Sequence, residues 1–433
     1  MRIDIFPKSH IRGSITVPGD KSISHRAVML GSIADGITYI DGFLMGADCL
    51  STIACFRELG VSIDVNGNSV CVHGVGMHGL KPPVHPLDVG NSGTTIRLLS
   101  GILAAQHFSA TLTGDASILS RPMMRVVEPL RQMGAEINSP DGGIHAPLTI
   151  HGKPLHGINY VMPVASAQVK SAILLAGLYA DSPTTITEPY PSRDHTELML
   201  KAMDVRILAD ELDFENPRSI TIWPAQALHC AHINIPGDIS SAAFIITAAM
   251  LCPESHITIQ DVGINPTRTG ILDAYKDMGA DITISNRRLW NMEEVADISV
   301  ATSRLHGITI SGSIIPRLID EIPILAVAAS LAEGTTVIKD AQELRVKESD
   351  RIAAISHMLR NFGAEVDTTD DSIIIKGKSR LKGCHTDPKG DHRIAMAAAI
   401  AGLVADGNTS IEGAECVEVS FPGFFELLNS IGY

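Results

Sequence analysis

The sequence predicts an α/β protein made of two similar halves, each of three repeated units. The first observation is an amphipathic helix that ends in a tight turn and leads into a strand, a pattern that recurs six times. The second is a helix of small and apolar residues in every unit. The third is a Pro-Gly-Asp tripeptide that recurs about half the chain length later. Because internal repeats define architecture, these features predict α/β units with buried internal helices.

The helix-turn-strand pattern sets the size of the unit. Most copies place glycine just after the helix, where a left-handed backbone is easily adopted without a Cβ. Successive copies lie roughly 70 to 85 residues apart, too far for a solenoid and suitable for one compact α/β unit. The copies are 56–63, 130–137, 201–207, 275–282, 360–366 and a truncated 428–433.

The internal helices are apolar or small on nearly every face, so we expect sheets to surround them. Four of them begin beside basic residues, where the positive end of the helix dipole disfavours a cation unless an anion binds there. We therefore predict anion sites at these starts. The basic residues are Arg26, Arg97, Lys170 and Arg393, and the helices span 27–33, 95–105, 169–179, 241–251, 324–331 and 394–404.

The Pro-Gly-Asp repeat marks the domain boundaries. Residues 17–20 are echoed by residues 235–238, and Pro-Gly cannot continue a helix or a central strand. We expect residues 1–20 and 236–433 to form one discontinuous domain of three units. Residues 21–235 form an inserted domain of three units, with a ligand cleft between the halves.

Composition excludes several function classes. The chain has 34 Lys and Arg against 48 Asp and Glu, a net charge of −14, so we expect neither nucleic acid nor membrane as a partner. The sequence shows no targeting peptide and no apolar run of the ~18 to 20 residues that spans a bilayer. We expect a soluble, cytoplasmic protein whose basic residues act locally.

The seven cysteines are scattered, with no C-x-x-C pair and no histidine at finger spacing. This pattern is typical of reduced thiols in a cytoplasmic protein. We expect no disulfide framework and no metal.

Four segments carry a family resemblance: PGDKSISHR (18–26), GNSGT (90–94), LRVKESDR (344–351) and DHR (391–393). In this order, on a six-unit repeat, they closely resemble the 5-enolpyruvylshikimate-3-phosphate synthase family, and the resemblance runs from near residue 3 to the C-terminus. It implies the enolpyruvyl transferase fold, an inside-out α/β barrel of two domains with three βαβαββ units each.

The resemblance also implies a reaction. The enolpyruvyl group of phosphoenolpyruvate is transferred to the 5-hydroxyl of shikimate 3-phosphate by addition and elimination, with release of phosphate and no cofactor. Both small-molecule substrates are multiply anionic, which explains cations at helix starts in an acidic protein. We expect a monomer, because the amphipathic helices already have an internal use.

The family pattern implies a set of substrate-binding residues. Arg121 and Arg351 would hold phosphoenolpyruvate, and Lys347 would bind the phosphate of shikimate 3-phosphate. Lys347 and Arg351 stand four residues apart, which predicts that they share a helical face. The full set is Lys21, Ser22, Arg26, Gly93, Thr94, Arg121, Ser166, Ala167, Gln168, Arg193, Asp320, Lys347, Arg351 and Arg393.

Two acids would move the protons. Asp320 matches the family's base, Glu348 matches the proton donor, and Lys21 is a possible co-participant. Taken alone, the charged run around Glu348 is typical of a solvated helix face. Asp20 and Asp238 are expected as helix caps or crossover anchors, and Ser240 and Ser241 as caps of the fourth internal helix.

Two alternatives stay open at this point. The sister enzyme transfers enolpyruvyl to UDP-N-acetylglucosamine, but it carries a reactive cysteine where this chain has Ala116. A non-catalytic anion-binding protein would keep the basic residues and lose the chemistry. The presence of both Asp320 and Glu348 argues against that alternative.

Overall fold

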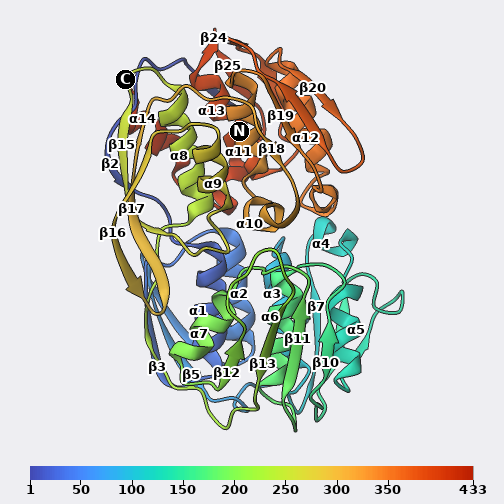
Figure 1. Cartoon of the computed structure of the whole chain (residues 1–433). Helices are drawn as coiled ribbons and strands as arrows, with labels where there is room; N and C mark the ends of the chain where they lie inside the picture. The colour runs from blue at the N-terminus through green and yellow to red at the C-terminus, as the bar shows by residue number, and fades with distance from the viewer. Residues whose placement is uncertain (433) are drawn as a thin grey trace. The chain divides into compact units, whose positions relative to one another are not determined.

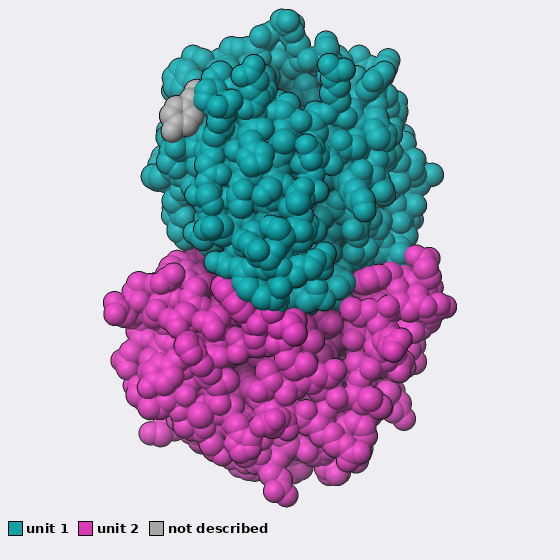
Figure 2. Space-filling view, turned by 60° about the vertical axis from the view of Figure 1, so that its left-hand side comes forward, with its two compact units in different colours: residues 1–18, 236–288, 294–433 teal, residues 19–235, 289–293 magenta. Residues whose placement is uncertain are grey.

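The computed structural model describes residues 1–432 and divides the chain into two compact units (Figures 1 and 2). Unit 1 contains residues 1–18, 236–288 and those from 294 onward, and unit 2 contains residues 19–235 and 289–293. Each unit has its own hydrophobic core. Within residues 1–432, none of the helices has the length and apolar character that a bilayer crossing requires.

Unit 2 contains three four-stranded sheets of one topology. In each sheet the first two strands are parallel and the remaining neighbours are antiparallel. The first sheet has the order β14 (His232–Asn234), β3 (Asp35–Asp41), β5 (Ser69–Val75), β4 (Ser62–Asn66). The second has the order β6 (Leu87–Asp88), β7 (Ser109–Thr113), β9 (Leu148–His151), β8 (Glu136–Asn138). The third has the order β10 (Asn159–Val161), β11 (Thr184–Glu188), β13 (Arg218–Ile222), β12 (Ile207–Ala209).

Unit 1 repeats this design and takes strands from the start of the chain. One sheet has the order β16 (Ile282–Trp290), β17 (Glu293–Ala301), β15 (His256–Gly263), β2 (Arg12–Thr16). Another has the order β18 (Thr309–Ile310), β19 (Thr335–Ile338), β21 (Ile373–Lys376), β20 (Glu365–Thr368). The sixth repeat differs from the other five repeats. It has a three-stranded sheet, β1 (Ile3–Ile5), β25 (Thr409–Ile411), β23 (His385–Thr386), and a two-stranded one, β22 (Leu381–Lys382) with β24 (Ala405–Asp406).

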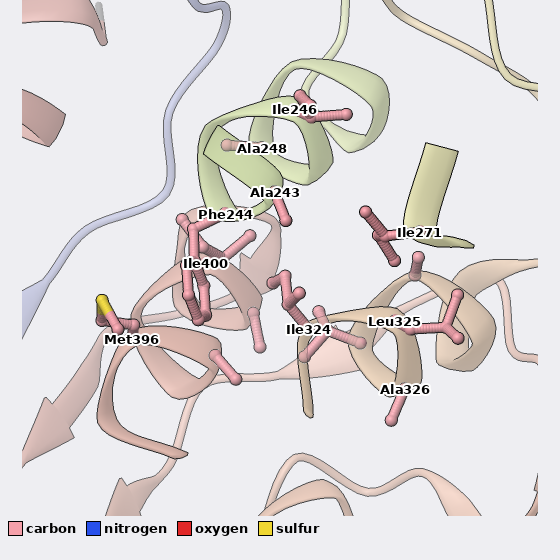
Figure 3. Packing of buried hydrophobic residues seen from close by; sticks show 14 of the residues in the cluster. Ala243, Phe244, Ile246, Ala248, Ile271, Ile324, Leu325, Ala326, Met396 and Ile400 are labelled. Carbon is pink, nitrogen blue, oxygen red and sulfur yellow. The ribbon is translucent and has the colours of Figure 1, made fainter. Parts of the chain in front are cut away.

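The six internal helices are confirmed, and they begin earlier than the sequence pattern predicts. They are α1 (Lys21–Ile33), α3 (Gly93–Leu103) and α6 (Ala167–Gly177) in unit 2, and α8 (Ile239–Leu251), α11 (Ile322–Leu331) and α13 (His392–Leu403) in unit 1. Each packs against the sheet of its own repeat. In Figure 3, Phe244, Ile324 and Ile400 point into the space between α8, α11 and α13. Small residues on these helices permit this close packing.

Along the chain, each amphipathic helix follows the internal helix of its own repeat, and it buries one of its faces. They are α2 (Ala47–Glu58), α5 (Met124–Gln132), α7 (His195–Ala202), α9 (Gly270–Asp277), α12 (Arg351–Asn361) and α14 (Phe424–Ile431). Shorter helical segments are α4 (Ala116–Ser120), α10 (Ile315–Leu318), η1 (Gly312–Ile314), η2 (Gln342–Val346) and η3 (Ala414–Val419).

The predicted left-handed turn after these helices is confirmed in five copies and wrong in the sixth. Gly60, Gly134, Gly279 and Gly363 have positive φ, and Asp204 takes the same conformation at φ 63° without being glycine. Gly432 follows α14 with φ −105° in an extended conformation, and it forms a bridge to Ile11. Tyr433, the last residue of that copy, lies outside the described residues.

Replacing Asp204 with glycine should stabilise the protein. The left-handed region costs a residue with a Cβ roughly 1 kcal/mol, so we expect the free energy of unfolding to rise by about 0.5 to 1 kcal/mol. Chemical denaturation measures this. Gly363→Ala is the matched control: its Cβ would meet nothing within 4 Å, so only its φ of +79° should destabilise. If the unchanged protein, Asp204→Gly and Gly363→Ala were equally stable, the left-handed backbone at residues 204 and 363 would be contradicted.

Candidate active site

The internal helices of unit 2 begin at side-chain caps. Asp20 accepts from the amide of Ile23 at the start of α1, as predicted. Ser92 caps α3, and Ser166 caps α6 by accepting from Val169. Because each cap satisfies an otherwise unpaired amide, the helix starts are fixed in place.

The predicted residues on α1 differ in their environment. Lys21 is half-buried, with its Nζ 3.2 Å from Oδ2 of Asp48, and Ser22 beside it is half-buried. Arg26 is buried. Its guanidinium donates to the hydroxyls of Thr196 at 2.6 Å and Ser171 at 2.7 Å and to the carbonyl of Ser22 at 2.8 Å. Burial lowers the pKa of Arg26 to about 10, so it stays charged at neutral pH.

Arg193 lies between β11 and α7 and is partly buried. Its positive charge contributes to lowering the pKa of Arg26, which places the two guanidinium groups within electrostatic range of each other. Glu197, Asp20 and Glu293 act on the pKa of Arg26 in the opposite direction, so Arg26 lies among charges of both signs.

Two predicted residues join α3 to α6. The Gln168 amide accepts from Arg97 at 2.7 Å and donates to the hydroxyl of Thr94 at 3.1 Å. Ala167 is the first residue of α6, directly after the Ser166 cap. These bonds keep the starts of the two helices together.

Arg121 follows α4 and lies beside Gly93. Its guanidinium donates to Asn91 at 2.9 Å and to Ser117 at 3.0 Å, while Nε has no hydrogen-bond partner within the described residues. A Cβ on Gly93 would stand 2.8 Å from Nη1 of Arg97 and 3.1 Å from Nη1 of Arg121. Glycine at this position is therefore what lets two guanidinium groups approach the backbone of α3.

Lys170 corrects one prediction. It was expected to serve an anion site, but its side chain is fully buried, with Nζ 3.1 Å from Glu188, 2.8 Å from Glu197 and 3.1 Å from the carbonyl of Ser192. Burial alone would lower the pKa of Lys170, but the two carboxylates outweigh burial and raise it. Lys170 is thus an internal ion-pair partner.

Unit 1 carries the second cluster, centred on Asp320 between α10 and α11. Its Oδ1 lies 3.3 Å from Nζ of Lys347 and 3.4 Å from Nη1 of Arg351, and its carbonyl accepts from Arg393 at 2.9 Å. The two cations favour the carboxylate form of this largely buried acid.

Lys347 and Arg351 do not share a helical face, contrary to prediction. Lys347 ends η2 in an extended conformation, and α12 begins only at Arg351, after the Asp350 cap. Asp350 accepts from the amide of Ala353, which starts the helix too late to include Lys347. The two cations meet instead at Asp320.

Arg351 is held almost entirely out of water by three carboxylates. It forms a two-pronged contact with Asp391, at 2.9 and 3.3 Å, and its Nη2 lies 2.7 Å from Oε2 of Glu348. Burial alone would lower the pKa of Arg351, but Glu348, Asp391 and Asp320 outweigh burial and raise it. Glu348 therefore lies in the cluster, and it is not on a solvated helix face.

Asp391 and Glu321 were not among the predicted site residues. Asp391 caps α13 through the amide of Arg393 and also anchors Arg351. Glu321 is fully buried at the start of α11, 3.6 Å from Arg393 and 3.7 Å from Arg268, and it accepts from the hydroxyl of Ser240. A capping aspartate before an apolar helix was a usable signal for Asp391, but no local pattern marks Glu321.

The cap of α8 also differs from prediction in part. Asp238 accepts from the amide of Ser240, as expected of a cap. Ser240 itself does not cap the helix: it receives a hydrogen bond from Arg268 and donates to Glu321.

Comparison with known proteins gives the family. The model of the family described as EPSP synthase (3-phosphoshikimate 1-carboxyvinyltransferase) matches residues 5–428. The chain belongs to the EPSP synthase family. A 3-phosphoshikimate 1-carboxyvinyltransferase from Brevibacillus brevis is 56% identical over 421 residues, covering 97% of each chain. One from Thermoanaerobacter sp. is 55% identical over 431 residues, covering 100% of each. The solved structure of EPSP synthase from Acinetobacter baumannii is 46% identical, with a TM-score of 0.88 over 100% of this chain and 98% of that one.

Removing the carboxylate of Glu321 should destabilise this family member strongly. Glu321→Ala leaves the buried guanidinium groups of Arg268 and Arg393 short of an anion, and breaking a buried pair costs about 3 kcal/mol or more. Chemical denaturation would measure the loss.

Glu365→Ala is the matched control for Glu321→Ala. Glu365 also lies between two cations, Lys376 at 3.5 Å and Lys378 at 3.3 Å, but its side chain is 56% exposed. We expect a loss below about 1 kcal/mol for this exposed site. A loss at Glu321 no larger than at Glu365 would show that the buried carboxylate does not hold the cluster.

Proposed function

We propose that the two clusters described above carry out the reaction of the EPSP synthase family. The chain is a 3-phosphoshikimate 1-carboxyvinyltransferase, which transfers the enolpyruvyl group of phosphoenolpyruvate to the 5-hydroxyl of shikimate 3-phosphate and releases phosphate. This transfer is a step of aromatic amino acid biosynthesis through the shikimate pathway. The observation that supports the assignment best is the unit 1 cluster, where Asp320 and Glu348 share the cation Arg351.

Anion recognition is assigned to the cations of each cluster. In unit 2, Lys21, Arg121 and Arg193 provide positive charge, while Gly93 and Thr94 offer backbone and hydroxyl donors. Arg26, with Ser22, Ser166, Ala167 and Gln168, completes the shikimate 3-phosphate contacts. In unit 1, Lys347 takes the phosphate of shikimate 3-phosphate, and Arg351 and Arg393 take phosphoenolpyruvate. Guanidinium groups suit phosphate and carboxylate because they bind both in a two-pronged geometry.

Asp320 is assigned the proton of the 5-hydroxyl. Its two cation contacts favour the carboxylate, which is the form a general base needs. As the oxygen adds to C2 of phosphoenolpyruvate, the methylene carbon accepts a proton and a tetrahedral adduct forms. The bond to the phosphate oxygen then breaks, and loss of a methyl proton restores the enol double bond.

Glu348 is assigned as the proton donor, with Lys21 as a co-participant. In the described structure Arg351 favours the carboxylate form of Glu348. When phosphoenolpyruvate binds to Arg351, its negative charge would offset the positive charge of the guanidinium and raise the proton affinity of Glu348. Substrate binding would thereby prepare the acid.

The remaining assignments follow from the family and the sequence. We propose that the chain acts in the cytoplasm as a monomer, without metal or cofactor in the reaction. We also propose that residues 1–20 with 236–433, and residues 21–235, act as its two catalytic domains. Compact units of nearly these bounds support the division.

Phosphate release tests the substrate assignment. Purified protein is mixed with phosphoenolpyruvate and either shikimate 3-phosphate or UDP-N-acetylglucosamine, and inorganic phosphate is measured. We expect turnover with shikimate 3-phosphate alone. Turnover with the UDP-sugar would favour the sister activity, and release with neither acceptor would favour anion binding without catalysis.

Asp320→Asn should reduce kcat by about 10² to 10⁴-fold, because the amide keeps the shape and loses the base. KM for both substrates should change much less. Asp406→Asn is the control, an aspartate that is 67% exposed and paired with Arg380. Near-normal kcat in Asp320→Asn would remove this residue from the proton transfer.

Gly93→Ala should raise KM for phosphoenolpyruvate while leaving KM for shikimate 3-phosphate nearly unchanged. The added Cβ would push the flexible ends of Arg97 and Arg121 away from the backbone, so donor binding should suffer more than folding. Steady-state kinetics and a thermal melt measure both effects. An unchanged donor KM would show that the hydrogen bonds of Arg121 serve the structure alone and not the binding of phosphoenolpyruvate.

A further inference from the structure

The strand pair β4–β5 of unit 2 carries a cluster of three different metal-binding side chains outside the candidate active site. Asp64 lies directly opposite Cys71 in the register of the pair, and His73 is two residues beyond Cys71 on the same strand. Side chains two apart on a strand share a face. The pleat therefore places a carboxylate, a thiol and an imidazole together.

The opposite face of the same strands is occupied. Ile63, Val70 and Val72 are buried in the core of unit 2, where α1 packs against β5. Asp64, Cys71 and His73 therefore have to point outward. All three are at least partly accessible: the side chain of Asp64 is 74% exposed and that of His73 42% exposed.

The distances fit a shared ion. Nε2 of His73 lies 3.1 Å from Oδ2 of Asp64 and 3.8 Å from Sγ of Cys71, and the ligand atoms all lie within 4.8 Å of one another. A tetrahedral zinc ion with bonds of about 2.3 Å to sulfur and about 2.0 Å to nitrogen and oxygen separates S and N by about 3.5 Å and N and O by about 3.3 Å. Small side-chain rotations would bring the three atoms to these separations.

We propose that Asp64, Cys71 and His73 bind a divalent cation of the zinc type on the outer face of the β4–β5 pair. Sulfur and imidazole ligands select borderline ions such as Zn²⁺ and Co²⁺ over Mg²⁺ and Ca²⁺, which require oxygen ligands. Three protein ligands leave the fourth position to water. The absence of finger spacing does not argue against this site, because its ligands come from two paired strands.

The metal also changes the state of the thiol. Cysteine binds a metal ion as the thiolate, so the Cys71 thiol would have to lose its proton. The ion would bind the thiolate and displace that proton. Bound between two strands, it would also stabilise the sheet that supports α1.

Cobalt titration of the metal-stripped full-length protein tests the site. We expect one Co²⁺ per chain, a thiolate-to-cobalt absorption band, displacement by Zn²⁺ but not by Mg²⁺ or Ca²⁺, and a higher melting temperature with metal. Cys71→Ser should abolish the band, and His73→Gln should weaken binding by at least about tenfold. Both positions lie on the outer face, so melting without metal should stay near that of the unchanged protein.

Two matched variants separate this site from general surface binding. Cys230→Ser removes an exposed thiol elsewhere in unit 2, and His145→Gln removes a histidine that lies 2.7 Å from Asp141 but is not part of the three-ligand cluster. Both should bind Co²⁺ like the unchanged protein. Absence of stoichiometric binding, binding that survives Cys71→Ser and His73→Gln, or loss of binding in Cys230→Ser would each overturn the proposal.

Discussion

Charged side chains that leave water must be matched by partners within the same unit, and this constraint shapes both clusters. Arg351 shows it most clearly, because the guanidinium is 1% exposed and three carboxylates surround it. One of them, Asp391, also caps α13. A single carboxylate thus fixes both the start of a buried helix and the position of a cation.

The same constraint explains why a strongly acidic chain can bind anionic substrates. The cations assigned to binding lie at helix ends and in the adjoining loops, where hydroxyls, carbonyls and carboxylates hold them. Arg26 uses Thr196 and Ser171 for this purpose, and Arg393 uses the carbonyl of Asp320. Preformed geometry of this kind reduces the reorganisation needed when an anion binds.

Features that depend on local sequence could be predicted, and features that depend on distant partners could not. The internal helices, the glycine turns and the Asp20 cap follow from periodicity and backbone preference. Lys170 looked like an anion-binding residue because its partners Glu188 and Glu197 come from later segments. The hydrogen bond between Ser240 and Glu321 spans 81 residues, so no local pattern could show it.

The sixth repeat and η2 show a second limit. The last sheet takes β1 from the start of the chain, so the C-terminal sequence alone does not contain all its strands. Spacing placed Lys347 and Arg351 on one helix, but the Asp350 cap begins that helix only at Arg351. Capping decided the local structure where charge spacing suggested otherwise.

A double-mutant cycle between Arg351 and Asp391 tests the central claim most directly. Arg351→Ala, Asp391→Asn and the double variant are compared by kcat/KM for phosphoenolpyruvate, after thermal melts establish that each is folded. If Asp391 acts by holding Arg351, the two losses should be strongly non-additive, with a coupling energy of about 1.5 kcal/mol or more. Additive losses would contradict the account, because they would mean that the carboxylate and the cation contribute independently.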